Sequence, residues 1–289
     1  MSYDLHTHSV LSDGTQSVQE LVAEIAHCGL TGFSLTDHDT TAGWQSAQKY
    51  ADDWGLDFLP GMEISCAIGP LSVHLLSYGH QQNDSVLNKH ITQARTSRRT
   101  RAQRIVQKLS ETYPITWEDV LAQASSGATI GRPHIADALV NANIIKTRSE
   151  AFSGLLADHS AYYVPYRAVH PVDAVTMVKA AGGVPIMAHP RARIRGQVAS
   201  AELIEQMIEA GLSGLEIYHR DNNEEDRNWL KKLAQKYDLI ITGSSDYHGA
   251  GKPNRLAENT TPAQTVERIK EIIRQNHQKN TPPQHTQTI

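Results

Sequence analysis

The stretch DLHTHSVLSDG, residues 4–14, starts as a short strand and carries His6, His8 and Asp13 at its end. Side chains at positions i and i+2 of a strand point to the same side, so His6 and His8 can hold one ion between them. A helix is predicted directly afterwards, over residues 17–28. Ser17 and Glu20 form a capping-box pair at its start, and a glycine follows its last residue. The chain therefore opens with a strand, a loop rich in metal-binding side chains, and a helix.

The same order of apolar run and amphipathic stretch recurs further along the chain. Apolar runs are found in TGFSLTDHD (31–39), LDFLPGMEIS (56–65), LSVHLLSYG (71–79), GGVPIMAHP (182–190), GLSGLEIYH (211–219) and DLIITGSSDYHG (238–249). Helices are predicted between several of them, at about 201–210 and 223–237. Repeated units of this kind favour an α/β fold with parallel strands wrapped by helices, either as a barrel or as an open doubly wound sheet.

Residues 80–170 interrupt this alternation. They contain a long helical pattern, NDSVLNKHITQARTSRRTRAQRIVQKLS, and several shorter ones. We therefore predict a barrel domain from residues 1–80 and 171–276, a helical insertion at 81–170, and a frayed polar tail at 277–289. The two histidines of that tail, His277 and His285, are assigned no role.

Composition limits the classes of protein that the chain can belong to. It has 289 residues, 39% hydrophobic and 20% charged, with a formal net charge of -4. Such a chain can bury a large core, but it does not coat nucleic acid by charge alone. With two cysteines and no long apolar run, we expect no disulfide framework, no membrane span and a cytoplasmic location. The 15 histidines, beside only three phenylalanines, are an excess that needs a use.

Many histidines and carboxylates fall on or directly after predicted strands. In parallel α/β proteins the carboxyl ends of the strands share one face, which carries the active site. A single buried histidine is often only a hydrogen-bonded core residue, but pairs spaced by two at strand ends are not explained that way. The set is larger than one ion can use, which predicts two or three divalent metals. The predicted ligands are His6, His8, Asp13, His38, Glu63, His74, His189, Asp246 and His248.

The motifs DLHTHSVLSDGT, LTDHDT, PGMEIS, VHLLSYG, MAHPR and SSDYHG resemble, in the same order, those of the polymerase and histidinol phosphatase (PHP) family. The resemblance implies a distorted (β/α)7 barrel with a three-metal phosphoesterase centre. It assigns Glu63 a catalytic role as a bridge between two ions. The implied ligand sets are His6, His8, Glu63 and Asp246 for one metal, Asp13, His38 and His248 for a second, and Glu63, His74 and His189 for a third.

Within the family, IGRPHIADAL (130–139) resembles the branch of 3',5'-nucleoside bisphosphate phosphatases and the 5'-to-3' exoribonuclease ribonuclease AM. Proline suits the first turn of a helix, so Arg132 is expected beside a helix N-terminus, where an anion is favoured. Arg132 and His134 are therefore predicted to bind phosphate and to act in catalysis. Whether His134 or a metal stabilises the leaving oxygen stays open. On local pattern alone, the alternative is a capped surface helix.

Three further residues are candidate substrate contacts. Arg98 interrupts an apolar stripe of the long helix, so it should either extend to solvent or point at a buried group. Arg191 follows the proline after His189, and His219 ends the sixth strand on the active-site face without a place among the ligand sets.

The sequence thus predicts a phosphoric ester hydrolase with two or three divalent ions, manganese by preference and iron or zinc as alternatives. The substrates that the resemblance implies are nucleoside 3',5'-bisphosphates, cut at the 3'-phosphate, and 5'-phosphorylated short RNA, cut from the 5' end. Histidinol phosphatase activity is the alternative within enzymes, and a non-catalytic metal-stabilised binding module is the alternative outside them. No protein partner and no membrane contact are expected.

Overall fold

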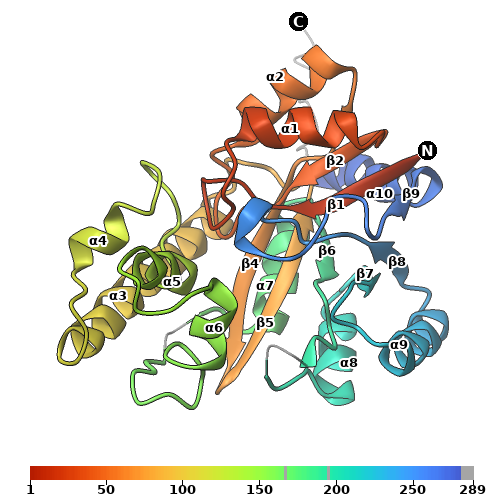
Figure 1. Ribbon diagram of the computed structural model, residues 1–289. Helices are drawn as coiled ribbons and strands as arrows, with labels where there is room; N and C mark the ends of the chain where they lie inside the picture. Colours follow the sequence, from red (N-terminus) through yellow and green to blue (C-terminus); the bar gives the residue numbers. More distant parts are fainter. Residues whose placement is uncertain (166–167, 194–195, 281–289) are drawn as a thin grey trace, which may run out of the picture.

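The fold is a mixed α/β arrangement built on two sheets, as seen in a computed structural model (Figure 1). The structure describes residues 1–165, 168–193 and 196–280. The first sheet has the strand order β3-β2-β1-β9 and the second the order β4-β5-β6-β7-β8. The strands are β1 (Ser2–Thr7), β2 (Gly32–Leu35), β3 (Asp57–Phe58), β4 (Gly61–Ile68), β5 (Leu71–Tyr78), β6 (Val184–Met187), β7 (Gly214–Tyr218), β8 (Ile240–Gly243) and β9 (Thr261–Pro262).

The first sheet follows the unit predicted from the N-terminal sequence. Helix α1 (Val18–His27) has the expected capping box between Ser17 and Glu20. Helix α2 (Trp44–Trp54) ends at Gly55, whose φ of 67° lies in the left-handed region that glycine tolerates. Both helices bury apolar side chains in one core with β2 and β3. These strands and helices place the loop after β1 where the first sheet meets the second.

The strands are not all parallel, which corrects the prediction. Parallel pairing holds for β1-β2, β2-β3, β6-β7 and β7-β8, but β4 and β5 form an antiparallel hairpin and β5 also pairs antiparallel with β6. The hairpin turn is the pair Gly69 and Pro70 between two apolar runs, and Gly69 has a φ of 57°. A two-residue loop containing glycine is a hairpin signal, and a helical crossover cannot fit there.

Two isolated parallel bridges connect the sheets at the site, Thr7 with Tyr247 and His38 with Glu63. The pairing of the described strands thus gives two sheets, with bridges that run from the ends of β1 and β2 to β4 and to the turn after β8. A closed (β/α)7 ring stays a prediction. Helices α7 (Pro171–Ala180), α8 (Ala201–Glu209) and α9 (Glu224–Tyr237) cover the second sheet and share its core.

The first four described helices after β5 pack around a separate apolar core, to one side of the β4-β5 hairpin (Figure 1). That core includes Ile105, Leu109, Ile135 and Leu139, all buried. The predicted division of the chain at residues 80 and 170 agrees with this packing and remains a prediction. The helices are α3 (Ser85–Ser110), α4 (Trp117–Leu121), α5 (Arg132–Asn141) and α6 (Arg148–Ser153).

The predicted tail begins too early. Helix α10 (Ala263–Asn280) extends through residue 277, and Nε2 of His277 lies 2.9 Å from the carbonyl oxygen of Gly79. Val266 and Ile269 anchor the helix in the core beside β1, and apolar residues at this spacing lie on one face of a helix. His285 lies outside the described residues. Among the helices of the described ranges, none has both the length and the apolar character needed to span a membrane.

Candidate metal centre

The nine predicted ligands converge on one buried region between the two sheets. The ligand atoms of eight of them form three overlapping groups, each with all of its ligand atoms within 4.8 Å of one another. The groups are His8, Asp13, His38 and His248; His6, His8, Glu63 and Asp246; and His38, Glu63 and His74. His189 lies beside the third group, with Nε2 3.3 Å from Oε1 of Glu63.

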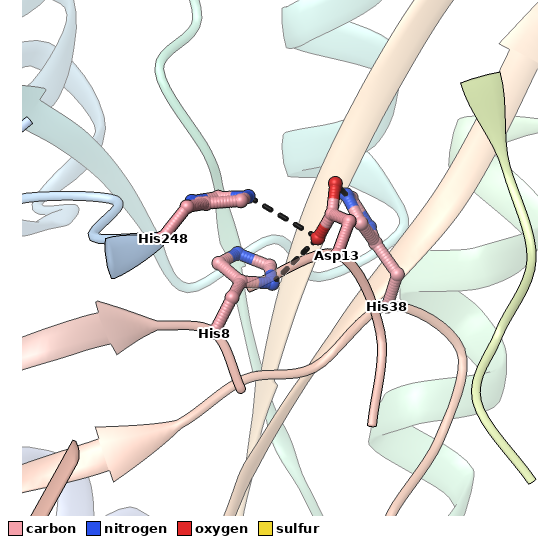
Figure 2. A group of neighbouring side chains, drawn as sticks. All are labelled: His8, Asp13, His38 and His248. Carbon is pink, nitrogen blue, oxygen red and sulfur yellow. Dashed lines mark ion pairs between the residues drawn. The ribbon is translucent and has the colours of Figure 1, made fainter. Parts of the chain in front are cut away.

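The first group is drawn in Figure 2, where three imidazoles surround the Asp13 carboxylate. Oδ1 of Asp13 lies 3.2 Å from Nε2 of His248 and 3.5 Å from Nδ1 of His8. Oδ2 lies 3.7 Å from Nε2 of His38. The loop after β1, the loop after β2 and the turn after β8 therefore meet at one point, although residues 13 and 248 are far apart in sequence.

Glu63 is the residue that the second and third groups share. Its Oε2 lies 3.3 Å from Nε2 of His6, 3.2 Å from Nε2 of His8 and 3.2 Å from Nδ1 of His38. Its Oε1 lies 2.7 Å from Nδ1 of His74. Each oxygen thus faces a different cluster of imidazoles, which is the geometry that a bridging carboxylate needs.

Glu63 is the third residue of β4, so it lies within a strand and not after one. Ser65 is paired with His74 across the hairpin, so Glu63 and His74 are diagonal neighbours on one face of the ladder. The antiparallel hairpin therefore delivers two ligands from its sheet face. His6 lies within β1, and the remaining ligands come from loops that follow strands.

Hydrogen bonds on the outer side of the imidazoles set which nitrogen faces the centre. Nδ1 of His6 lies 3.0 Å from Oε1 of Glu216, and Nδ1 of His248 lies 2.8 Å from the carbonyl oxygen of Asp246. The Nε2 atoms of His6, His8 and His248 are buried and make no hydrogen bond among the described residues. Metal-bound histidines have this arrangement, with one nitrogen on the ion and the other held by a protein oxygen. The residues present therefore fit a metal centre.

Two aspartates support the ligand loops from behind. Asp37 accepts hydrogen bonds from Ser9 and Ser12, and Asp39 accepts them from Ser65, as expected for carboxylates that flank His38. Asp39 and the ligand Asp246 have positive φ angles of 51° and 54°. Backbone strain of this kind persists where the surrounding contacts enforce it, and it is concentrated at functional sites.

The charges of the centre are coupled. Burial alone would raise the pKa of Glu63, but the imidazoles of His74, His38 and His6 hold that pKa well below its ordinary value. Burial alone would lower the pKa of His6, but Glu216 and Glu63 outweigh it and raise that pKa. The charged form of Glu63 is therefore favoured, and a buried charge of this kind is stable only beside cations.

Sequence reasoning missed two residues at this centre. Glu216 is fully buried on β7 and also accepts a hydrogen bond from the backbone nitrogen of His189. Its signal was a carboxylate inside the apolar run GLEIY. Lys252 places Nζ 3.0 Å from Oδ2 of Asp246, and its position in the glycine-rich turn after His248 was the only hint.

The predicted substrate residues lie at different distances from the centre. His219 is fully buried, with Nε2 3.6 Å from Oδ2 of Asp246. Arg98, with 12% of its side chain exposed, donates a hydrogen bond to Ser65 and lies 3.6 Å from Asp39. His134 is buried at the start of α5 and accepts a hydrogen bond from the backbone nitrogen of Gly131.

Two predicted phosphate contacts point to protein carboxylates in this structure. Arg132 lies 2.8 Å from Asp158, which is half exposed. Arg191 lies 3.0 Å from Asp226 and packs over the ring of Trp229. Asp226 is buried, so Arg191 belongs to an ion pair that is part of the packed protein. The substrate roles of both arginines stay predictions.

The chain belongs to the PHP family: the family model described as the PHP domain matches residues 4–154. The phosphoribosyl 1,2-cyclic phosphate 1,2-diphosphodiesterase of Eggerthella lenta is 30% identical over 86% of this chain and 95% of its own. The 3',5'-nucleoside bisphosphate phosphatase of Chromobacterium violaceum is 28% identical over 89% and 90%. A 5'-3' exoribonuclease of Haemophilus influenzae is 29% identical over 85% and 89%. The predicted resemblance to this branch of the family is therefore confirmed.

A solved structure has a similar mixed α/β fold. A protein from Bifidobacterium adolescentis, provisionally described as a metal-dependent phosphoesterase, superposes with a TM-score of 0.91. It is 42% identical in sequence and covers 93% of this chain and 96% of its own. The mixed α/β fold is thus one that this relative shares.

Proposed function

We propose that this protein is a metal-dependent phosphoesterase that removes the 3'-phosphate of nucleoside 3',5'-bisphosphates and degrades 5'-phosphorylated short RNA from its 5' end. The observation that carries the proposal is the set of three overlapping histidine and carboxylate groups around Glu63. The names of the relatives support the class of reaction, since a phosphatase, a phosphodiesterase and an exoribonuclease all hydrolyse phosphoesters.

The nine ligands would hold two or three divalent ions, with Glu63 shared between two of them. The mixture of imidazole and carboxylate donors suits manganese, iron or zinc, and we propose manganese. When bound, such ions polarise the phosphoryl group and make water a nucleophile at neutral pH. We also propose a cytoplasmic location.

We propose that His134 contacts the substrate phosphate. Its Nδ1 accepts a hydrogen bond from Gly131, which leaves the proton on Nε2 for donation. Burial lowers the pKa of His134, so its neutral form prevails at pH 7. A neutral imidazole with a fixed tautomer is a hydrogen-bond donor to a phosphate oxygen, and we assign it this role before that of a proton donor to the leaving group.

The arginines would hold the second anionic group of the substrate. An exposed ion pair such as Arg132 with Asp158 contributes about 0–1 kcal/mol, so a phosphate can replace Asp158 at little cost. Arg98 connects Asp39 with the turn before α5, since a Cβ on Gly131 would lie 2.9 Å from Nη2 of Arg98. Arg191 is the weakest candidate because its partner Asp226 is nearly buried.

A second candidate substrate is a phosphoribosyl 1,2-cyclic phosphate, favoured by the 30% identity to the Eggerthella lenta diphosphodiesterase over 86% of this chain. This compound and the nucleotide substrates share a ribose that bears a 5-phosphate. A common handle on that phosphate would allow the metals to act on a different ester in each case.

The test is a hydrolysis assay with metal-loaded protein on four substrates at equal concentration. They are adenosine 3',5'-bisphosphate, a 5'-phosphorylated oligoribonucleotide, phosphoribosyl 1,2-cyclic phosphate and histidinol phosphate. We expect the highest kcat/KM on the bisphosphate, and no activity after removal of metal or in Glu63→Ala. A preference for histidinol phosphate would establish the histidinol phosphatase alternative. No hydrolysis of any of the four by a metal-loaded protein would favour a non-catalytic binding module.

A further inference from the structure

Arg148, the first residue of α6, connects three segments that are distant in sequence. Its guanidinium forms a bidentate ion pair with the carboxylate of Asp137, with Nη2 2.5 Å from Oδ2 and Nε on Oδ1. Its Nη1 also donates a hydrogen bond of 2.9 Å to the backbone carbonyl oxygen of Asp13. The side chain is 13% exposed, and no sequence motif pointed to it.

The Asp13 loop and the turn after His248 are themselves tied together. The backbone nitrogen of Thr15 donates to the carbonyl oxygen of His248, and the hydroxyl of Thr15 accepts from Ala250. Arg148 packs against this pair of segments, because a Cβ on Gly251 would lie 2.2 Å from its Nη1. It therefore contacts the backbone that carries two ligands of the group in Figure 2.

The other end of the bidentate pair belongs to the helix that carries His134. Asp137 follows His134 by three residues, so the two side chains lie on neighbouring positions of one face of α5. The charges of Asp13, Asp137 and Arg148 all act on the His134 ring. One chain of contacts thus runs from α5 through Asp137 and Arg148 to the loop of Asp13.

We propose that Arg148 and Asp137 form a positioning pair that holds the Asp13 and His248 metal group assembled and seats α5 over it. Arginine suits this role because its planar fork binds a carboxylate with two bonds and still has a donor for a third oxygen. The inference rests on the proposed metal centre and goes beyond it. Through this pair, the helices after β5 control how strongly the Asp13 and His248 group binds its metal.

The test compares metal binding, measured by titration into metal-free protein, for wild type, Arg148→Ala, Arg148→Lys and Asp137→Asn. Loss of a residue that orients a ligand weakens metal binding by about 10–100-fold. We expect this loss for one ion per chain in Arg148→Ala, with the remaining ions bound as in wild type. Arg148→Lys should show the same loss of metal affinity, because an ammonium group cannot make the bidentate contact with Asp137. Excess metal should recover turnover in Arg148→Ala.

The matched control is Arg274→Ala, which removes an exposed arginine from its ion pair with Glu271 on α10. It should bind metal as wild type does. Asp137→Asn keeps the size of the side chain, and a melting temperature for each variant checks that it is folded. If Arg148→Ala and Asp137→Asn bind metal with the affinity of wild type, the positioning role is wrong and the proposed function is unaffected. A wild-type protein that binds no metal would overturn both the inference and the proposed function.

Discussion

At the scale of single residues, the shared position of Glu63 leads to a ranking of variants. Glu63→Ala should reduce metal content and turnover more than Asp13→Ala, because Glu63 faces both the His6 and His8 cluster and the His74 side of the centre. Asp13 serves one group. Elemental analysis and kcat at saturating metal measure the difference. Equal and mild losses in both variants would remove the bridging role.

A buried histidine away from the centre gives a dependence of stability on pH. His80 is 4% exposed, its ring centroid lies 4.7 Å from that of Trp44, and its Nδ1 lies 2.7 Å from the hydroxyl of Ser77. Burial lowers the pKa of His80 to about 4, although the charge of Asp84 acts in the opposite direction and that of His277 in the same one. The unfolded chain therefore binds a proton near its ordinary pKa of 6.5, before the folded chain does.

His80 therefore does not reduce the free energy of unfolding above about pH 6.5. Its protonation in the unfolded chain lowers that free energy as the pH decreases from 6.5 towards 4. The contribution of this one group is about 3 kcal/mol at most, at 1.36 kcal/mol for each pH unit. Urea unfolding of metal-free protein at several pH values measures it. The variant His80→Gln should lose less stability than wild type across that interval. Parallel curves for the two proteins would show that the buried imidazole titrates normally.

The residues that could be predicted from sequence are those whose local pattern carries the chemistry. His6, His8, Asp246 and His248 stand in pairs spaced by two, and the shared orientation of His6 and His8 follows from strand geometry. Asp246 and His248 lie instead in the turn after β8, where Asp246 has a φ of 54°. Glu216 and Lys252 could not be predicted in the same way. Their roles depend on contacts with His6 and Asp246, which lie more than two hundred positions away or in an irregular turn.

At the scale of elements, helices were predicted better than strand directions. The starts of α1, α8 and α9 follow from the capping residues Ser17, Ser200 and Asn223, because a cap is a local hydrogen bond. Strand direction depends on the connection, and the short Gly69 and Pro70 turn was the only sign that β4 and β5 are antiparallel. The hairpin nevertheless delivers Glu63 and His74 to the centre, so the ligand prediction does not depend on the parallel assumption.

The loop after β1 is packed so closely that it does not tolerate a side chain at Gly14. A Cβ there would lie 2.4 Å from the carbonyl oxygen and 2.6 Å from the carbonyl carbon of His8, both backbone atoms. Gly14→Ala must therefore displace Asp13 from His8, with a cost of about 1–3 kcal/mol in stability and a loss of metal. Metal content and melting temperature measure both effects.

The control for Gly14 is Gly29→Ala, at the end of α1. Its φ of 72° makes alanine unfavourable, but no atom lies within 4 Å of the added Cβ. This variant should lower the melting temperature and keep its metal. If Gly14→Ala binds metal as Gly29→Ala does, the packing of the loop does not determine the centre.

At the scale of the whole molecule, the arrangement of two sheets and a separate helical core sets where a substrate can lie. The metal ligands come from both sheets, whereas Arg132 and His134 come from α5. A substrate with two anionic groups can place one of them on the metals and the other on α5. Charge at both ends of the site would allow a chain with net charge -4 to select the polyanionic substrates that we propose.

This geometry predicts that the 5'-phosphate is the recognition handle. For a nucleoside 3',5'-bisphosphate, a handle on Arg132 leaves the 3'-phosphate over the metals. For RNA, the same handle leaves the first internucleotide linkage there and forces digestion from the 5' end. Arg132→Ala should lower kcat/KM by about 10²–10³-fold, taking the scale measured for losing one strong donor to an anionic oxygen, with unchanged metal content. Asp158→Ala is the matched control, because it removes the present partner of Arg132 and should keep or raise activity.

The measurement compares kcat/KM for an oligoribonucleotide with a 5'-phosphate or a 5'-hydroxyl, and for the 3',5'-bisphosphate or the 3'-monophosphate. Equal rates within both pairs, or an equal loss in Asp158→Ala and Arg132→Ala, would contradict the handle, because neither the 5'-phosphate nor the freed guanidinium would then contribute to binding.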